Sequence, residues 1–386
     1  MPPPKTILAA LNRPPGGAGY LLSSSASSPQ AKGNRMSQSY LHRMAQGTPT
    51  IFWNDSCVVS ELERAVANGA TGATSNPPLV LRAVQQEPTK WNPVLQDLIR
   101  QGNHRSDQDL AWALIRRIVG EASRVLLKLY QDSKGEQGLL SVQVDPTQYQ
   151  NADAMITQAI QVHGFAPNLS IKIPVTAAGL VAIEELASRG INTTCTVSFT
   201  VPQALHIEQA YQRGLKRLRP GAREPFCFAV LMAGRLDDHL KDVAKEKGLA
   251  IDPALIERAG SAVVKKSYRL FAERHCRSIL LVGGMRGLYH ITDFVGGRLV
   301  LTISPAYQED ICKQDPPLRE AMAEPVPRET LAELERAIPD FARAYAEDGM
   351  APAEFEHFGS NLKTQGQFIK AYLGLLEHVK ARQASA

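Results

Sequence analysis

Lys172 lies in the middle of an apolar segment, residues 169–175, that has the length and composition of a buried strand. An ammonium group is costly to bury unless it is paired, and burial lowers the pKa of a lysine toward neutrality. A neutral amine attacks carbonyl carbon, so this position favours a nucleophilic lysine. The alternative is a lysine on an edge strand with its ammonium group in water, which is the commoner situation for this residue type.

Polar side chains recur with the same alternation in several other apolar segments. Successive side chains of a strand point to opposite faces, so residues two apart share a face. The residues that share a polar face in this way are Thr74 with Asn76, Ser141 with Gln143, Ser170 with Lys172, and Thr194 with Thr196 and Ser198. Asp55 closes a further segment. A polar face repeated in so many segments predicts one shared site and favours the functional interpretation of Lys172.

The residue types on this face suit aldol chemistry at a ketone. A neutral lysine condenses with a ketone to give an imine and water, and the protonated imine withdraws electrons from the neighbouring C–C bond. Asp55 is a carboxylate that can take or return the hydroxyl proton. Gln143 and Thr196 can hold a water molecule, although neither can act as a base. Thr74 and Asn76 can bind substrate hydroxyls, but for Asn76 alone a helix-capping role before a proline is the simpler interpretation.

Short apolar segments alternate with helix-like patterns through most of the chain, which predicts parallel strands joined by crossovers. The expected strands span residues 50–55, 70–76, 139–145, 169–175, 191–199, 225–234, 278–284 and 298–304. The expected helices span residues 61–67, 107–132, 153–162, 177–188, 202–213, 254–275 and 287–294. Eight such strands close an α/β fold of the (β/α)8 TIM-barrel type, whose catalytic residues come from the C-terminal ends of the strands. A doubly wound open sheet competes, but no Gly-rich dinucleotide-binding turn follows the first strand.

Three regions are expected along the chain: a low-complexity extension over residues 1–48, a barrel over 49–326, and a helical extension over 327–386. The helices of the last region are expected at 331–345 and 362–379 and should pack on the barrel. The first region is rich in proline and serine and has no acidic residue, so we expect it to be disordered. Its composition is that of an organellar transit peptide. A translation start at Met36, with upstream codons included by mistake, explains the same composition equally well.

The remaining composition excludes several classes of protein. The net charge of +5 arises largely in the first fifty residues, and no basic stripe interleaved with aromatics indicates a nucleic-acid partner. No apolar run reaches the roughly 18 residues of a membrane-spanning helix. The five cysteines are odd in number and widely spaced, which predicts free thiols in a reducing cytoplasm. No histidines have metal-ligand spacing, and imine chemistry needs no metal or other cofactor; His290 is expected on the surface.

Seven segments resemble, in the same order, segments of the transaldolase family. They are residues 52–55, 73–77, 142–146, 171–174, 190–196, 234–237 and 301–305. The combination of Ser-Asn-Pro with Ile-Lys-Ile-Pro is specific, whereas either motif alone would be weak. The resemblance covers residues 49–305 and implies a cofactor-free β/α barrel that moves a dihydroxyacetone unit between sugar phosphates. It implies Lys172 as the imine-forming residue and Arg235 as the phosphate-binding residue.

The resemblance also implies Asp55 as the proton-transfer carboxylate and Thr74, Asn76 and Thr196 as site residues. The chain departs from the family pattern at Gln143, where most transaldolases carry a glutamate. A glutamine there is similar to the related fructose-6-phosphate aldolases, which cleave without transfer.

Other departures affect the residues expected to bind substrate. Met232 stands where those aldolases carry a tyrosine, and Met232 and Ser198 are expected to contact substrate. After the seventh expected strand, a Gly-Gly-Met-Arg run replaces the family's Ser-x-Arg phosphate clamp. Its glycines either bind an anion through backbone N–H groups, helped by Arg286, or form only a tight turn.

Three functions therefore stay open at the level of the sequence. The first is a transaldolase-like transferase, and the second is an aldolase that cleaves a sugar or polyol without transfer. The third is a sugar-binding barrel without catalysis, which gains nothing from a buried lysine and is disfavoured for that reason. The expected partner is a small sugar or sugar phosphate, and the C-terminal helices could form a homo-oligomer contact.

Overall fold

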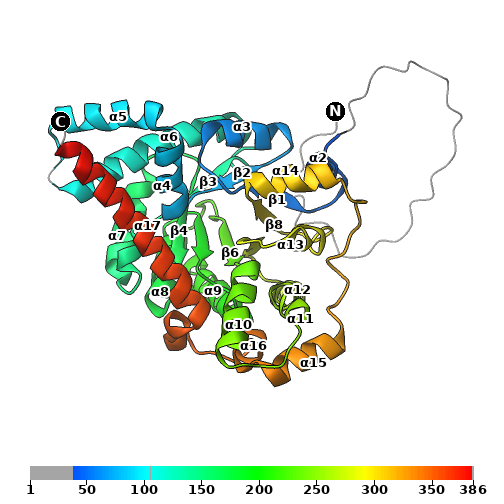
Figure 1. Ribbon diagram of the computed structural model, residues 1–386. Helices are drawn as coiled ribbons and strands as arrows, with labels where there is room; N and C mark the ends of the chain where they lie inside the picture. Colours follow the sequence, from blue (N-terminus) through cyan, green and yellow to red (C-terminus); the bar gives the residue numbers. More distant parts are fainter. Residues whose placement is uncertain (1–37, 105, 385–386) are drawn as a thin grey trace, which may run out of the picture.

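The centre of the molecule is a closed barrel of eight parallel strands, in which each strand pairs with the next and β8 pairs with β1 (Figure 1). The computed structural model describes residues 38–104 and 106–384. The strands are β1 (Ile51–Asn54), β2 (Gly72–Thr74), β3 (Leu139–Gln143), β4 (Leu169–Pro174), β5 (Thr193–Thr196), β6 (Cys227–Leu231), β7 (Ile279–Val282) and β8 (Val300–Ile303). The predicted TIM barrel is confirmed. A closed barrel has no edge, so the edge-strand interpretation of Lys172 is wrong.

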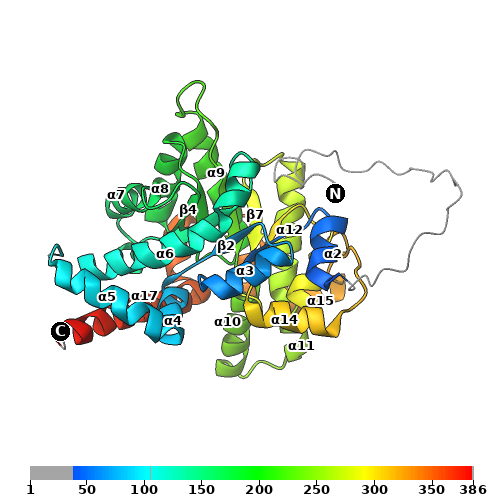
Figure 2. The same ribbon diagram turned by 90° about the horizontal axis from the view of Figure 1, so that it is seen from above.

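Helices surround the barrel and cover its strands (Figure 2). Those before the eighth strand are α2 (Tyr40–Gly47), α3 (Val59–Ala67), α4 (Pro77–Gln86), α5 (Pro88–Gln101), α6 (Asp107–Asp132), α7 (Ala152–His163), α8 (Ala177–Ser188), α9 (Val201–Leu215), α10 (Ala233–Glu246), α11 (Pro253–Ile256), α12 (Ala259–Glu273) and α13 (Tyr289–Thr292), with a 3-10 turn η1 (Pro146–Gln148). The later ones are α14 (Pro305–Gln314), α15 (Arg328–Ala337), α16 (Pro339–Tyr345), η2 (Pro352–His357) and α17 (Gly359–Gln383).

The differences from the expected helices have local causes. The single helix expected over 254–275 is two helices, α11 and α12. Helices α4, α5 and α14 are not among the expected ones, although each has a proline in its first turn, a common start signal of a helix. Helix α10 begins inside the segment expected as a strand. The start of this helix is not visible in the sequence, because residues 227–233 are all apolar and the hydrophobic period does not change at the boundary.

The interior of the barrel is filled by side chains rather than by a channel. Trp53 of β1 and Phe228 of β6 meet edge to face with ring centroids 4.7 Å apart, and both are fully buried. Gly72 of β2 makes room for this pair, since a Cβ there would lie 2.6 Å from the Trp53 ring. Large rings close this part of the barrel and leave the opposite, C-terminal end for a pocket.

Residues 38–48 do not belong to a disordered extension. Helix α2 is capped by Ser39, whose side chain accepts from the His42 amide, and it buries Tyr40, Leu41 and Met44 against the barrel. It contacts β1 and α14. The expected boundary at residue 48 is therefore wrong, and the part of the extension before residue 38 lies outside the described residues.

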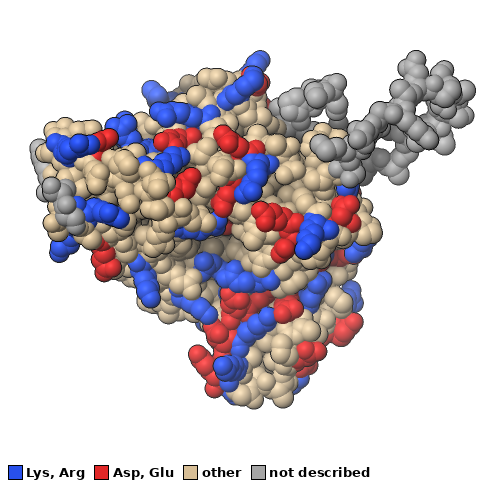
Figure 3. All heavy atoms as spheres, turned by 45° about the horizontal axis from the view of Figure 1, so that its top comes forward, with Lys and Arg blue, Asp and Glu red and all other residues tan. Residues whose placement is uncertain are grey.

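The C-terminal helices pack on the barrel layer. Helix α17 contacts α4, α6 and α10, and Figure 1 shows it (in red) running diagonally across the front of the molecule. Figure 3 shows acidic and basic side chains interspersed over the face in view, without a large area of one sign. No helix within the described residues combines the length and apolarity needed to cross a membrane.

Candidate active site

A cavity of about 270 Å³ opens at the C-terminal end of the barrel and is lined from the ends of seven strands and the loops after them. It brings together most of the residues expected to form a site. Those that line it are Asp55, Thr74, Asn76, Lys172, Thr196, Met232, Arg235 and Arg286. Ser198 does not line the cavity, and Gln143 lies beside it.

Lys172 is positioned by β4, where Ile171 and Ile173 face outward into the helix layer and turn the lysine inward. The residue is 5% exposed, and its Nζ donates a long hydrogen bond of 3.4 Å to the carbonyl oxygen of Ser75. Burial lowers the pKa of Lys172 to about 8, with Asp55 acting in the opposite direction and Arg235 lowering it further. About a tenth of this amine is therefore neutral at pH 7, against less than about a thousandth for a lysine with the ordinary pKa.

Asp55 is held by two threonines. The Thr74 hydroxyl donates to its Oδ1 at 2.5 Å, and the Thr302 hydroxyl lies 2.7 Å from that of Thr74. Because the Thr74 proton points to Asp55, Thr302 must be the donor to Thr74. Thr302 was not named as a site residue, although it shares the inward face of β8 and strand alternation would have found it. The carboxylate is thus fixed in place while its second oxygen remains available.

Ser198 is the one expected contact that the structure removes from the site. Strand β5 ends at Thr196, and Val197 adopts a positive φ of 55°, which a β-branched residue rarely takes. The alternation of faces therefore stops before Ser198, whose hydroxyl donates to the carbonyl oxygen of Val230 at 2.5 Å. Thr196 stays in the cavity, where its hydroxyl lies 4.0 Å from the Met232 sulfur.

Gln143 is paired in register with Lys172 on the neighbouring strand. The residue is 4% exposed and lines a small cavity of about 20 Å³ together with Asn76, Trp112 and Tyr372. Neither amide atom of Gln143 has a hydrogen-bond partner among the described residues. A cavity of this size is about large enough for one water molecule, and the amide supplies both a donor and an acceptor to it.

Asn76 caps a helix and also lines the main cavity. Its Oδ1 accepts the amide hydrogen of Leu79 at 3.0 Å and so caps α4, while the residue also lines the main cavity. The cap fixes the amide orientation, so its Nδ2 group is the part left for a ligand.

Two guanidinium groups lie at the outer part of the cavity. Arg235, in the first turn of α10, is oriented by helix α17: it donates to Gln367 at 2.5 Å and lies over the ring of Phe368 at 5.6 Å. Burial lowers the pKa of Arg235, and the like charge of Arg286 lowers it further. Two cations held side by side favour an anionic ligand between them.

Arg286 follows a turn in which Gly284 has a φ of 65°, a conformation that favours glycine. Its guanidinium pairs with Asp238 at 2.7 Å and still lines the cavity. Both interpretations of the Gly-Gly run therefore have a basis in the structure, since the glycines form a tight turn and also line the cavity. Ser304 and Tyr307, at the start of α14, line it as well and were not expected.

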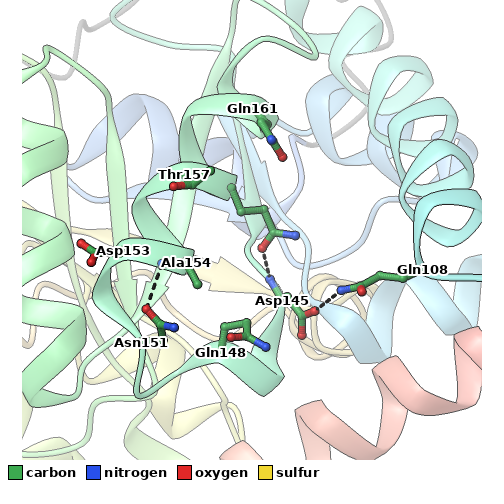
Figure 4. A pocket seen from close by; sticks show the side chains of 9 residues that line it. Gln108, Asp145, Gln148, Asn151, Asp153, Ala154, Thr157 and Gln161 are labelled. Carbon is green, nitrogen blue, oxygen red and sulfur yellow. Dashed lines mark hydrogen bonds between the residues drawn. The ribbon is translucent and has the colours of Figure 1, made fainter. Parts of the chain in front are cut away.

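A second hollow, of about 440 Å³, lies outside the barrel between α6, η1 and α7 (Figure 4). Its polar groups bind one another: Asp145 accepts from Gln108 at 2.8 Å, and its own amide donates to Gln158 at 2.6 Å. It is lined mainly by amides and carboxylates, without lysine, cysteine or histidine. The larger of these two hollows thus has no amine, thiol or imidazole in its lining, whereas Lys172 lines the smaller one.

Within the described residues no group of three or more His, Cys, Asp or Glu side chains is arranged to hold a metal ion.

Comparison with known proteins agrees with this geometry. The family model of transaldolase/fructose-6-phosphate aldolase matches residues 52–357. A transaldolase of Thiobacillus denitrificans is 27% identical over 333 residues, covering 81% of this chain and 90% of the relative. Transaldolases of Mycolicibacterium smegmatis and Mycobacterium tuberculosis are each 29% identical, over 52% of this chain and 55% of each relative. The chain belongs to the transaldolase/fructose-6-phosphate aldolase family and is an enzyme of that kind.

Proposed function

We propose that the enzyme makes and breaks the C3–C4 bond of a ketose through an imine on Lys172. The observation that carries the proposal is a lysine that is 5% exposed and has a pKa of about 8, at the C-terminal end of a barrel strand. The amine adds to the C2 carbonyl and loses water to give a protonated imine. Cleavage of C3–C4 then releases an aldehyde and leaves the electron pair on the imine as an enamine.

Asp55 is the proposed group for proton transfer at the C4 hydroxyl. Its carboxylate takes the hydroxyl proton as the C3–C4 bond breaks and returns it when the enamine attacks an acceptor aldehyde. The hydrogen bond from Thr74 supports this role because it holds one oxygen of a carboxylate that lines the cavity. Gln143 and Thr196 are proposed to position the water lost and gained when the imine forms and hydrolyses.

The substrate is proposed to be a sugar phosphate. Arg235 and Arg286 line the same cavity as Lys172, and each planar guanidinium group can donate two parallel hydrogen bonds to the oxygens of a phosphate. With a phosphate at this end and the keto group at Lys172, the dihydroxyacetone-type unit of the ketose lies deepest. Transfer of that unit between sugar phosphates, the reaction of a transaldolase, is the function that this arrangement supports best.

A second candidate is cleavage without transfer, as in an aldolase, and Gln143 favours it. Where most transaldolases carry a glutamate, this chain has Gln143 beside Lys172, as the related fructose-6-phosphate aldolases do. The two reactions share the imine and differ only in what the enamine meets next, a proton or an aldehyde.

The test is borohydride reduction in the presence of dihydroxyacetone, fructose or fructose 6-phosphate, followed by peptide mass mapping. A three-carbon adduct on Lys172 is the expected result with all donors that the enzyme cleaves. Adding erythrose 4-phosphate as acceptor distinguishes the two reactions, since transfer yields a seven-carbon ketose phosphate and cleavage yields free dihydroxyacetone. The absence of any adduct would rule out the imine mechanism and favour a sugar-binding barrel.

A further inference from the structure

Helix α10 carries a buried carboxylate whose position the proposed chemistry does not explain. Asp237, two residues after Arg235, is fully buried and faces His290 of α13, which is also fully buried. The Asp237 Oδ2 and His290 Nε2 atoms are 3.1 Å apart, in a contact bent away from a linear hydrogen bond. The expectation that His290 lies on the surface is therefore wrong. Neither residue lines the main cavity, so the pair does not touch the proposed substrate.

The hydrogen bonds around this pair determine which ring nitrogen carries the proton. The backbone N–H of Arg286 donates to His290 Nδ1 at 3.1 Å, so Nδ1 must present a lone pair. The single proton of the neutral imidazole is then on Nε2, which faces Asp237. The other carboxylate oxygen, Oδ1, accepts the amide hydrogen of Gly260 at 2.7 Å. Oδ2 faces His290 and also accepts the Tyr289 hydroxyl at 3.4 Å, so each polar atom of the pair has an assigned role.

We infer that Asp237 and His290 are positioning residues that set the second guanidinium of the substrate cavity by fixing the backbone of Arg286. This inference rests on the proposed binding of an anionic sugar. The two glycines before Arg286 give the loop backbone wide conformational freedom, and the hydrogen bond to His290 holds the Arg286 amide at the end of that loop. The Arg286 side chain is held separately by Asp238, with Nε to Oδ2 at 2.8 Å.

One helix therefore organises both cations. Arg235 in its first turn projects into the cavity, Asp238 one turn later binds the guanidinium of Arg286, and Asp237 acts on the Arg286 backbone through His290. The packing between helix and loop is close, since a Cβ on Gly234 would lie 2.6 Å from the carbonyl oxygen of Gly284. A shift of the loop relative to α10 would separate the two guanidinium groups.

The isosteric change Asp237→Asn tests this arrangement. The Gly260 amide requires an oxygen opposite it, so the new amide nitrogen must face His290 and donate to Nε2. The imidazole proton then moves to Nδ1, where it opposes the N–H of Arg286, donor against donor. We expect KM for fructose 6-phosphate to rise about tenfold, the effect of one lost hydrogen bond that acts on binding, with kcat changed less than about twofold.

Two changes at His290 separate its two hydrogen bonds. In His290→Asn the side-chain oxygen reaches the position of Nδ1 and can still accept from Arg286, whereas in His290→Gln the amide reaches the position of Nε2 and leaves the Arg286 amide without an acceptor. We expect His290→Gln to raise KM as Asp237→Asn does, and His290→Asn to keep KM within about threefold of the unchanged enzyme. The reverse order would overturn the inference.

The matched control is His239→Gln on the same helix. His239 also pairs with a carboxylate, Asp340 at 2.8 Å, but it faces the C-terminal helices rather than the Arg286 loop. We expect this variant to lower the melting temperature and to leave KM unchanged. Melting temperatures of all variants show whether an effect on KM comes from general loosening; a rise in KM that follows the melting temperature in every variant would contradict a positioning role.

A neutral substrate and a simple anion complete the test. KM for unphosphorylated fructose should not change in Asp237→Asn, and the affinity for inorganic phosphate, measured by calorimetry, should fall about tenfold. Equal effects on both sugars, or unchanged phosphate affinity, would overturn the inference. The phosphate measurement needs no turnover, so it still decides the positioning role if borohydride trapping fails and the proposed imine reaction is wrong.

Discussion

Two layers of polar side chains inside the same barrel have opposite states of hydrogen bonding. In the lower layer, the Thr194 hydroxyl lies 2.8 Å from both the Ser141 and the Ser170 hydroxyls, and all three residues are fully buried. Gln143 and Lys172 follow Ser141 and Ser170 at the next inward positions of the same two strands. Gln143 has no hydrogen-bond partner among the described residues, and Lys172 makes only a long contact to a carbonyl oxygen.

The difference shows what distinguishes a structural polar residue from a functional one in this fold. Both layers share the inward face of the same strands, so alternation alone cannot separate them. The lower hydroxyls satisfy one another and contribute to stability, whereas the upper amine and amide are buried at a net cost in stability. Such a cost is typical of a site that a substrate completes.

The sharpest test of this comparison is Lys172→Met, which removes the amine while keeping a similar volume. We expect activity to fall at least about a thousandfold, because no other residue can form the imine. We also expect the fold to become more stable by up to about 3 kcal/mol at pH 7, from a pKa lowered to about 8. Assays and denaturant unfolding at pH 7 measure both effects; a loss of stability would show that the lysine is a structural residue.

Asp55→Asn should have the next largest effect. The amide keeps a hydrogen-bonding oxygen for Thr74 but cannot accept a proton, so we expect kcat to fall about 10²- to 10⁴-fold. Borohydride trapping of dihydroxyacetone on Lys172 should persist, since forming that imine does not require cleavage. If trapping is lost together with turnover, Asp55 acts on imine formation instead.

Arg235→Ala should weaken binding of an anionic substrate. We expect KM for fructose 6-phosphate to rise about tenfold to a hundredfold, the effect of one charged hydrogen-bonding partner, while KM for fructose changes little. Gln367→Ala, which removes only the group that orients Arg235, should raise the same KM by a smaller factor. Equal effects on the two sugars would make Arg235 a structural residue.

The pH dependence should follow the lowered pKa of Lys172. Below about pH 8 the amine is mostly protonated, so kcat/KM for a slow neutral substrate should rise about tenfold per pH unit and level off above about pH 8. Stability should change in the same direction: the unfolded lysine keeps its proton up to about pH 10.5, so the Lys172 contribution increases as pH rises from about 8 toward 10.5. Lys172→Met lacks this rise and is the control for unfolding.

Ser170→Ala should have the smallest effect. It removes one hydroxyl of the lower layer, and Thr194 keeps its bond to Ser141, so we expect a loss of about 1 kcal/mol in stability. Activity should stay within about twofold of the unchanged enzyme, measured beside thermal unfolding. A fall in activity well beyond twofold, with a loss of only about 1 kcal/mol in stability, would contradict the distinction between the two layers.

Much of the site was predictable from strand alternation and residue type. The period of two predicts that Thr74, Lys172 and Thr196 point inward and that the intervening residues point outward. The order of the strands follows from their alternation with helices along the chain. The same rule would have found Thr302. It failed at Ser198, because the positive φ of Val197 ends the alternation and no residue type in that segment signals it.

The barrel and the inward lysine are predictable from the amino-acid sequence, because hydrophobic periodicity relates residues that are close along the chain. Contacts between distant segments were decided only in the tertiary structure. The orientation of Arg235 depends on Gln367 and Phe368, more than a hundred residues away, and the burial of His290 depends on Asp237 of another helix. A side chain's partners across elements depend on how the elements pack, which no local pattern encodes.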